Sequence, residues 1–271
     1  MRKWDLANFT WPEVKNALPE VDAILVPVGS FEQHGPHTPF ETDTRIARGL
    51  AEKAAVLAQK KGGYLLVGPS VNMGYSWYHM DFPGSITLEG NTFVDVIRQI
   101  CHSLHYHGFK NIILLNAHGG NVVPLNMAVT FLREELSTSI YHVNYADLIT
   151  DIMSHTNDCL IHAGEVETSI CLALGIRVEM DRAVAEATDR QKTIEKKGVA
   201  TSRYFKYDAH HNGPGAAFPM QCIIEMSSSG VVGDPTKANK EFGKELVAKA
   251  SERIAQLCID LSGHNRKVNN K

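Results

Sequence analysis

Four compact apolar runs alternate along the chain with longer segments of helical periodicity. They occupy residues 23–29, 64–69, 111–116 and 140–144. Runs of this length with few polar residues are typical of strands that are buried on both faces, as in a parallel sheet. The first run ends in Gly29 and the second in Gly68-Pro69, residue types that commonly end a strand.

Apolar residues recur every three or four positions in the segments between these runs. Ile46, Leu50, Ala54 and Leu57 predict an amphipathic helix over 44–60. The pattern predicts further helices over 93–106, 123–136, 165–174 and 236–261. This order of strands and helices predicts an α/β fold with a mostly parallel central sheet, covered by helices on both faces.

The chain has no Pro- or Ser-rich linker and no internal repeat, so we expect a single domain over residues 1–271. The polar segment 182–197 predicts a surface excursion, and 207–219, rich in His, Gly and Pro, predicts a loop. Residues 263–271 are polar and predict a frayed tail.

The composition narrows the class of protein. Hydrophobic residues make up 44% and charged residues 21% of the chain, as in ordinary soluble proteins, and a net charge of -3 gives nucleic-acid binding no support. Five cysteines without a C-x-x-C pair argue against a disulfide framework or a thiolate zinc site. The N-terminus lacks the apolar core of a signal peptide, and no apolar run reaches about 18 residues. We therefore expect a cytoplasmic protein with no membrane partner.

Metal-binding residue types concentrate in three short stretches. They are Glu32-Gln33-His34-Gly35-Pro36-His37 with Asp43 after it, Asn116-Ala117-His118-Gly119-Gly120-Asn121, and His162-Ala163-Gly164-Glu165-Val166-Glu167. Carboxylates and imidazoles are ligands of divalent metal ions. The first two stretches directly follow predicted strands, and parallel sheets bind ligands outside the carboxyl ends of their strands. Together the stretches predict one metal site at this edge of the sheet.

Residues of the first two stretches could have a structural role instead of, or together with, metal binding. Glu32 and His34 point to the same side of extended backbone, whereas Asp43 could simply cap the following helix. After His118, two glycines permit a tight turn close to a ligand, and Asn121 could cap the next helix.

The third stretch offers two glutamates, Glu165 and Glu167. Residues two apart on a helix point to different sides, so we expect one of them to be functional and the other structural. With Glu32, His34, Asp43 and His118, that glutamate gives a donor set for two divalent ions, which activate a bound water and polarise a carbonyl. His162 would remain as a proton shuttle.

These three stretches resemble the signatures of the creatininase (creatinine amidohydrolase) family. The resemblance extends to Phe82-Pro83-Gly84-Ser85 and to Gly230-Val231-Val232-Gly233-Asp234-Pro235, and it covers the chain from about Trp11 to the final helix. It implies a three-layer α/β/α sandwich, a homo-oligomer that is often a hexamer, and two ions of zinc, manganese or iron. By position, Glu32 and His118 would hold one ion and His34 the other, with Asp43 bridging them.

One departure from creatininase proper concerns a glutamate two residues after the histidine of the second stretch, where this chain has Gly120. Conversely, creatininase proper has an apolar residue where this chain has Glu165. We infer that Glu165 supplies the lost carboxylate, and that Glu167 and Asn121 support the ligands from outside the first shell of donors. Residues 157–161 also lack the tryptophans that enclose creatinine, which argues against creatinine as the substrate.

The resulting hypothesis is a dinuclear amidohydrolase that cleaves a non-peptide carbon–nitrogen bond of a small cyclic amide or formamide. A metal-bridging hydroxide would attack the carbonyl, and His162 would protonate the leaving nitrogen. Substrate contacts are expected from Gly119, Gly120 and the aromatic segment Tyr75, Trp77, Tyr78 and His79, although this segment could instead be a subunit contact. His210 and His211 could reach the site from their loop. The alternatives are creatinine hydrolysis itself, a non-catalytic metal-binding assembly partner of a biosynthetic pathway, and a metal-free scaffold.

Overall fold

The computed structural model describes residues 2–153, 162–189, 193, 196 and 222–268. Its centre is a parallel four-stranded sheet in the order β2-β1-β3-β4. The strands are β1 (Ala23–Val28), β2 (Leu65–Val67), β3 (Asn111–Asn116) and β4 (Ser139–Asn144). This confirms the α/β class with a parallel central sheet.

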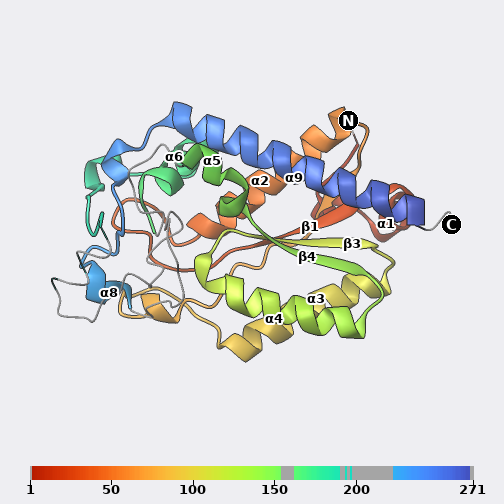
Figure 1. Ribbon diagram of the computed structural model, residues 1–271, viewed down its shortest axis with the longest axis horizontal. Coiled ribbons are helices and arrows are strands. Elements are labelled where there is room, and N and C mark those ends of the chain that lie inside the picture. The colour runs from red at the N-terminus through yellow and green to blue at the C-terminus, as the bar shows by residue number, and fades with distance from the viewer. Residues whose placement is uncertain (1, 154–161, 190–192, 194–195, 197–221, 269–271) are drawn as a thin grey trace.

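Helices cover both faces of the sheet (Figure 1). One face carries α2 (Thr42–Lys60), α6 (Glu165–Leu174) and α9 (Lys240–Val268), and the other carries α3 (Gly90–Tyr106) and α4 (Val122–Glu135). Shorter helices are α1 (Trp11–Ala17), α5 (Thr150–Met153) and α8 (Ile223–Met226). Short 3₁₀ segments occupy Leu6–Asn8, Leu18–Glu20, Trp77–His79, Gly119–Asn121, Tyr145–Ile149, Met180–Arg182 and Pro235–Lys237.

Alternation along the strands divides the core into two layers. In β1, Ala23 and Leu25 pack among α2 and α9, whereas Ile24 and Val26 pack among α3 and α4. Because both faces are covered, every residue of β1, β2 and β3 is buried. This explains why these strands are continuous apolar runs in the sequence.

The strand register brings three loops to one edge of the sheet. Val28 pairs with Asn116, and Asn116 pairs with Asn144, so β1, β3 and β4 end side by side. The loop after β1 carries the first donor stretch and the turn after β3 carries the second. The fold therefore brings the two together at the carboxyl edge.

Several boundaries differ from the predictions. Helix α2 begins at Thr42, so Asp43 lies inside its first turn, and Glu41 occupies the N-cap position. Helix α9 begins at Lys240 because Pro235–Lys237 forms a separate 3₁₀ turn, and it continues to Val268 through part of the predicted tail. Helix α1 was missed, although Thr10 and Glu13 form a capping box at its start.

The segment 207–219 lies outside the described residues, as does part of 182–197. Within the described part of the chain, no helix is long and apolar enough to cross a membrane.

Candidate metal centre

The donor residues of all three stretches converge at the carboxyl edge of the sheet and are buried. Glu32 and His34 come from the loop after β1, Asp43 from the first turn of α2, and His118 from the turn after β3. His162 lies three residues before α6, where an isolated bridge pairs it with Val232. The structure thus brings together Glu32 and His162, which are 130 positions apart in the sequence.

Three groups of side chains offer donor atoms that lie within 4.8 Å of one another. They are Glu32, Asp43 and His118; His34, His162 and Glu167; and Glu32, His79 and His162. Glu32 belongs to the first and third groups, and His162 to the second and third. Asp43 connects the first two groups, because its Oδ1 lies 3.0 Å from His34 Nε2 while its Oδ2 lies 3.3 Å from His118 Nδ1. The arrangement is a single continuous cluster of donors.

The spacing of these atoms fits coordination of a common ion. His118 Nδ1 lies 3.2 Å from Glu32 Oε1 and 3.3 Å from Asp43 Oδ2. Two ligands of one tetrahedral zinc ion, each about 2.0–2.2 Å from it, are separated by roughly 3.3 Å. Both Glu32 oxygens and Asp43 Oδ2 are fully buried, and none has a well-aligned hydrogen-bond donor among the described residues. Because buried carboxylate oxygens need a positively charged partner, the residues present fit divalent ions.

Backbone carbonyls orient the two ligand histidines. His34 Nδ1 donates to the Glu32 carbonyl at 3.1 Å, which leaves Nε2 facing Asp43. His118 Nε2 donates to the Tyr75 carbonyl at 3.0 Å, which leaves Nδ1 facing Glu32 and Asp43. Such outer hydrogen bonds fix the ring that a metal ion meets.

The ionisation of these groups shows which of them pair with each other. Burial lowers the pKa of His34, but the Asp43 carboxylate outweighs it and raises the pKa to about 9. Burial also opposes charge on His118, but Glu32 and Asp43 raise its pKa well above the ordinary value. Conversely, burial would raise the pKa of Asp43, but His34 and His118 lower it. His34 and His118 thus each hold a proton on the nitrogen that faces the carboxylates. Metal cations would displace these two protons.

Glu167, not Glu165, lies within the donor cluster. Ala163 has a left-handed backbone (φ 53°), which turns its N–H towards Glu167 Oε2 at 2.6 Å. Burial raises the pKa of Glu167 to about 7, with Asp43 adding and His34 opposing. Glu165 belongs to none of the donor groups of the described residues. The donor groups thus include Glu167 with His34, and the inference that Glu165 supplies the missing carboxylate stays a prediction.

The turn after β3 has no room for a side chain at Gly120. A Cβ atom there would lie 2.3 Å from the Tyr75 carbonyl oxygen and 2.4 Å from the Tyr78 hydroxyl. At Gly119, by contrast, a Cβ would meet nothing within 4 Å. Asn121 occupies the N-cap position of α4, but its side chain does not cap the helix. It instead accepts from Tyr75 N and donates to the Gly29 carbonyl, which ties the turn to two other loops.

The aromatic segment divides into exposed and buried residues. The side chain of Trp77 is exposed, Tyr75 is partly buried, and His79 is buried in the cluster with its Nε2 atom 3.1 Å from Glu32 Oε1. His79, which is predicted to contact substrate, also belongs to one of the three donor groups. The spacing of residues in the sequence could not identify His79, because it lies in a 3₁₀ turn that is distant in sequence from the three stretches. His210, His211 and residues 157–161 lie outside the described part of the chain.

Comparison with known proteins gives consistent matches. The family model for creatininase, described as creatinine amidohydrolase, matches residues 7–258. The chain is 27% identical to a 3-dehydro-scyllo-inosose hydrolase of Thermotoga maritima, over 94% of this chain and 82% of that protein. It is 30% identical to a mycofactocin precursor peptide peptidase of Mycolicibacterium smegmatis, over 90% and 88%. A manganese creatininase structure superposes with a TM-score of 0.72, at 23% identity over 94% of this chain and 97% of that one.

Proposed function

Because the chain belongs to the creatininase family and buries a cluster of carboxylates and imidazoles, we propose that it is a dinuclear metal-dependent hydrolase of carbon–nitrogen bonds. The proposed substrate is a small cyclic amide or a formamide. The observation that carries the proposal is Asp43, whose two oxygens face His34 on one side and His118 on the other. With its two oxygens on different histidines, Asp43 would be able to serve two ions at once.

Glu32, Asp43 and His118 would hold one ion, and His34, Asp43 and Glu167 the other. In this proposal Glu167 replaces Glu165 as the ligand that compensates for Gly120. Two such ions supply an activated water at neutral pH and polarise a carbonyl oxygen. We expect zinc, manganese or iron, since the donors are nitrogen and oxygen.

His162 is the proposed proton carrier. Its Nε2 donates to the Gln33 carbonyl at 2.6 Å, so its other nitrogen, Nδ1, is free to face the cluster. There Nδ1 lies 3.7 Å from Glu32 Oε1. His162 would accept a proton at Nδ1 from the attacking water and deliver it to the leaving nitrogen.

One relative, at 30% identity, is a mycofactocin precursor peptide peptidase. A peptide substrate is therefore the second candidate. The non-catalytic metal-binding partner and creatinine hydrolysis remain as alternatives that the same experiment addresses.

The test is a substrate panel on protein that is stripped by a chelator and then reconstituted with zinc, manganese or iron. The panel contains creatinine, other cyclic amides, formamides and short peptides. We expect hydrolysis of one amide class only after reconstitution with two ions per chain. Full activity in the stripped protein would overturn metal-dependent hydrolysis. Two bound ions with no turnover across the panel would favour the non-catalytic partner.

We also propose a homo-oligomer, with a hexamer favoured. The support is a row of exposed apolar side chains along α4, formed by Val123, Met127 and Phe131, which a monomer would leave in water. Light scattering on the purified protein tests this, and a monomer at micromolar concentration would contradict it.

A further inference from the structure

Gln33 lies between the two first-stretch ligands and contacts both of the remaining cluster histidines. It is buried, and its side-chain Nε2 lies 3.0 Å from His79 Nδ1. Its backbone carbonyl lies 2.6 Å from His162 Nε2. The proposed function uses only the backbone carbonyl of Gln33 and assigns no role to its side chain.

Two backbone groups fix which end of the Gln33 amide faces His79. Gly35 N–H donates to Gln33 Oε1 at 2.8 Å, and Gln33 Nε2 donates to the Gly230 carbonyl at 3.1 Å. A flipped amide would place NH₂ against an N–H and oxygen against a carbonyl, losing both bonds. Gly230 adjoins the amide so closely that a Cβ atom there would lie 2.0 Å from Gln33 Oε1. The atom that faces His79 is therefore the NH₂ donor.

The fixed amide determines the proton positions on His79. Because Gln33 Nε2 is a donor, His79 Nδ1 must be the acceptor, so the ring proton lies on Nε2. That nitrogen lies 3.1 Å from Glu32 Oε1. Double protonation of the ring would place an N–H against the Gln33 NH₂ group.

The backbone carbonyl of Gln33 contacts the other ring nitrogen in His162, so His162 turns Nδ1 rather than Nε2 towards Glu32. A carbonyl can only accept, so His162 Nε2 carries a proton, and in the neutral ring a bare Nδ1 faces Glu32 Oε1 at 3.7 Å. Both rings thus share the Nε2–H tautomer. His79 presents an N–H to Glu32 Oε1, whereas His162 presents a lone pair to the same oxygen.

We infer that Gln33 is a positioning residue that fixes what His79 and His162 present to the centre: a hydrogen-bond donor from His79 and a proton acceptor from His162. Its effect on turnover rests on the proposed hydrolase function, but the assignment of protons does not. The consequence for catalysis is a division of roles. His162 can take a proton from water, whereas His79 directs its N–H towards the Glu32 carboxylate and cannot take that proton.

The experiment measures ring-nitrogen protonation by long-range ¹H–¹⁵N correlation in the metal-free, ¹⁵N-labelled protein, with His79 and His162 assigned through His79→Gln and His162→Gln. We expect a protonated Nε2 and an unprotonated Nδ1 for both residues. A protonated Nδ1 on His79 in the wild-type protein would overturn the inference, and this result needs no Gln33 variant. It is also independent of metal binding and activity, so it separates this inference from the proposed function.

The decisive variant is Gln33→Glu, which has the same shape but replaces the NH₂ donor with an acceptor. We expect His79 to gain a proton on Nδ1, while His162 keeps its Nε2–H because the backbone carbonyl is unchanged. In the reconstituted enzyme, kcat/KM should fall roughly 10- to 100-fold, as for other partners that orient a site. Gln256→Glu, which makes the same change on the exposed side of α9, should alter neither readout. An unchanged His79 spectrum in folded Gln33→Glu would contradict the inference.

Discussion

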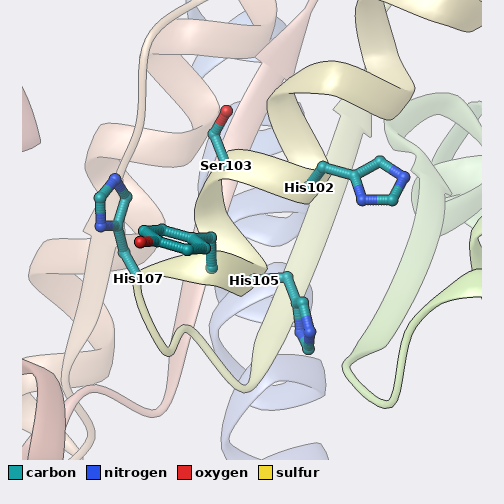
Figure 2. Close-up of a pocket in the computed structure, with 5 residues that line it drawn as sticks. His102, Ser103, His105 and His107 are labelled. Carbon is teal, nitrogen blue, oxygen red and sulfur yellow. The ribbon is translucent and has the colours of Figure 1, made fainter.

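Two groups of histidines lie at opposite ends of the parallel sheet, and only one has the character of a metal centre. His34, His79, His118 and His162 are buried at the carboxyl edge, where they surround Glu32 and Asp43. His102, His105 and His107 cluster near the end of α3, just before β3 begins, and line a surface cavity with Ser103 and Tyr106 (Figure 2). The number of histidines is similar, so it cannot be what distinguishes the two regions.

The difference lies in how the carboxylates are shared. In the α3 group the labelled histidines point in different directions (Figure 2), and His102 alone approaches a carboxylate, Glu135 Oε2 at 2.8 Å. Glu135 also pairs with Arg98, so its charge is already balanced. At the carboxyl edge, Glu32 and Asp43 each face several imidazoles and have no arginine or lysine partner among the ion pairs of the described residues. The candidate metal centre is therefore identified by buried carboxylates that each face more than one histidine, and not by the histidines alone.

The largest effect that would test this comparison is expected for Asp43→Asn. Removing the bridging charge should lower the metal content from two ions per chain to one or none, and lower kcat/KM by more than the roughly 100-fold cost of losing an outer-shell partner. Metal analysis after dialysis, together with activity on the best substrate, measures both. Glu135→Gln removes the carboxylate beside His102 and should leave metal content and activity unchanged. If Glu135→Gln lost metal as well, the distinction between the two regions would be wrong.

Glu167→Ala is expected to have the next largest effect. This variant should lose about one ion per chain, because Glu167 lies with His34 and His162 in one donor group. Glu165→Ala, two positions earlier on the same helix, is the matched control and should keep both ions. Metal analysis of the two variants side by side decides the assignment. Retention by Glu167→Ala with loss by Glu165→Ala would restore the original inference from the sequence.

These two glutamates show where prediction from sequence ends. The strands and most helices were predictable because buried runs and helical periodicity are local features. Convergence of Glu32, His34 and His118 was predictable too, since parallel strands end at one edge of a sheet. The choice between Glu165 and Glu167 depends on the rotation of α6, which the left-handed Ala163 helps to set. His79 depends on a 3₁₀ turn that only tertiary packing places beside Glu32.

A smaller, graded effect of pH on zinc affinity is expected at the carboxyl edge of the sheet. The Asp43 carboxylate raises the pKa of His34 to about 9 against the effect of burial, so this ring is protonated at neutral pH in the metal-free protein. A metal ion must displace that proton, so the affinity for the zinc ion held by His34 should increase about tenfold per pH unit between pH 7 and 9, and this contribution should level off above pH 9. Titrations of zinc binding across this range measure the slope. A flat profile would show that His34 is already neutral.

The same shift makes an opposite prediction for the stability of the metal-free protein. The folded-state pKa of His34 lies above its ordinary value of 6.5, so its stabilising contribution is complete below about pH 6.5. It is lost as the pH rises through 9. Urea unfolding of the metal-free protein should therefore show lower stability at pH 9.5 than at pH 6.5. The metal-loaded protein is the control, since the proton is already displaced there and this loss should disappear.

The smallest expected effect separates two neighbouring glycines in the turn that carries His118. Gly120→Ala should lower the free energy of unfolding by about 1–3 kcal/mol, because its Cβ would collide with the Tyr75 carbonyl, the Tyr78 hydroxyl and His118 Nε2. Gly119→Ala, which meets open space, should stay within about 0.5 kcal/mol of the wild type. Urea unfolding of the metal-free proteins measures both. Equal stabilities would mean that the turn relaxes freely. Steric crowding would then not be what excludes a side chain, such as that of a glutamate, from position 120.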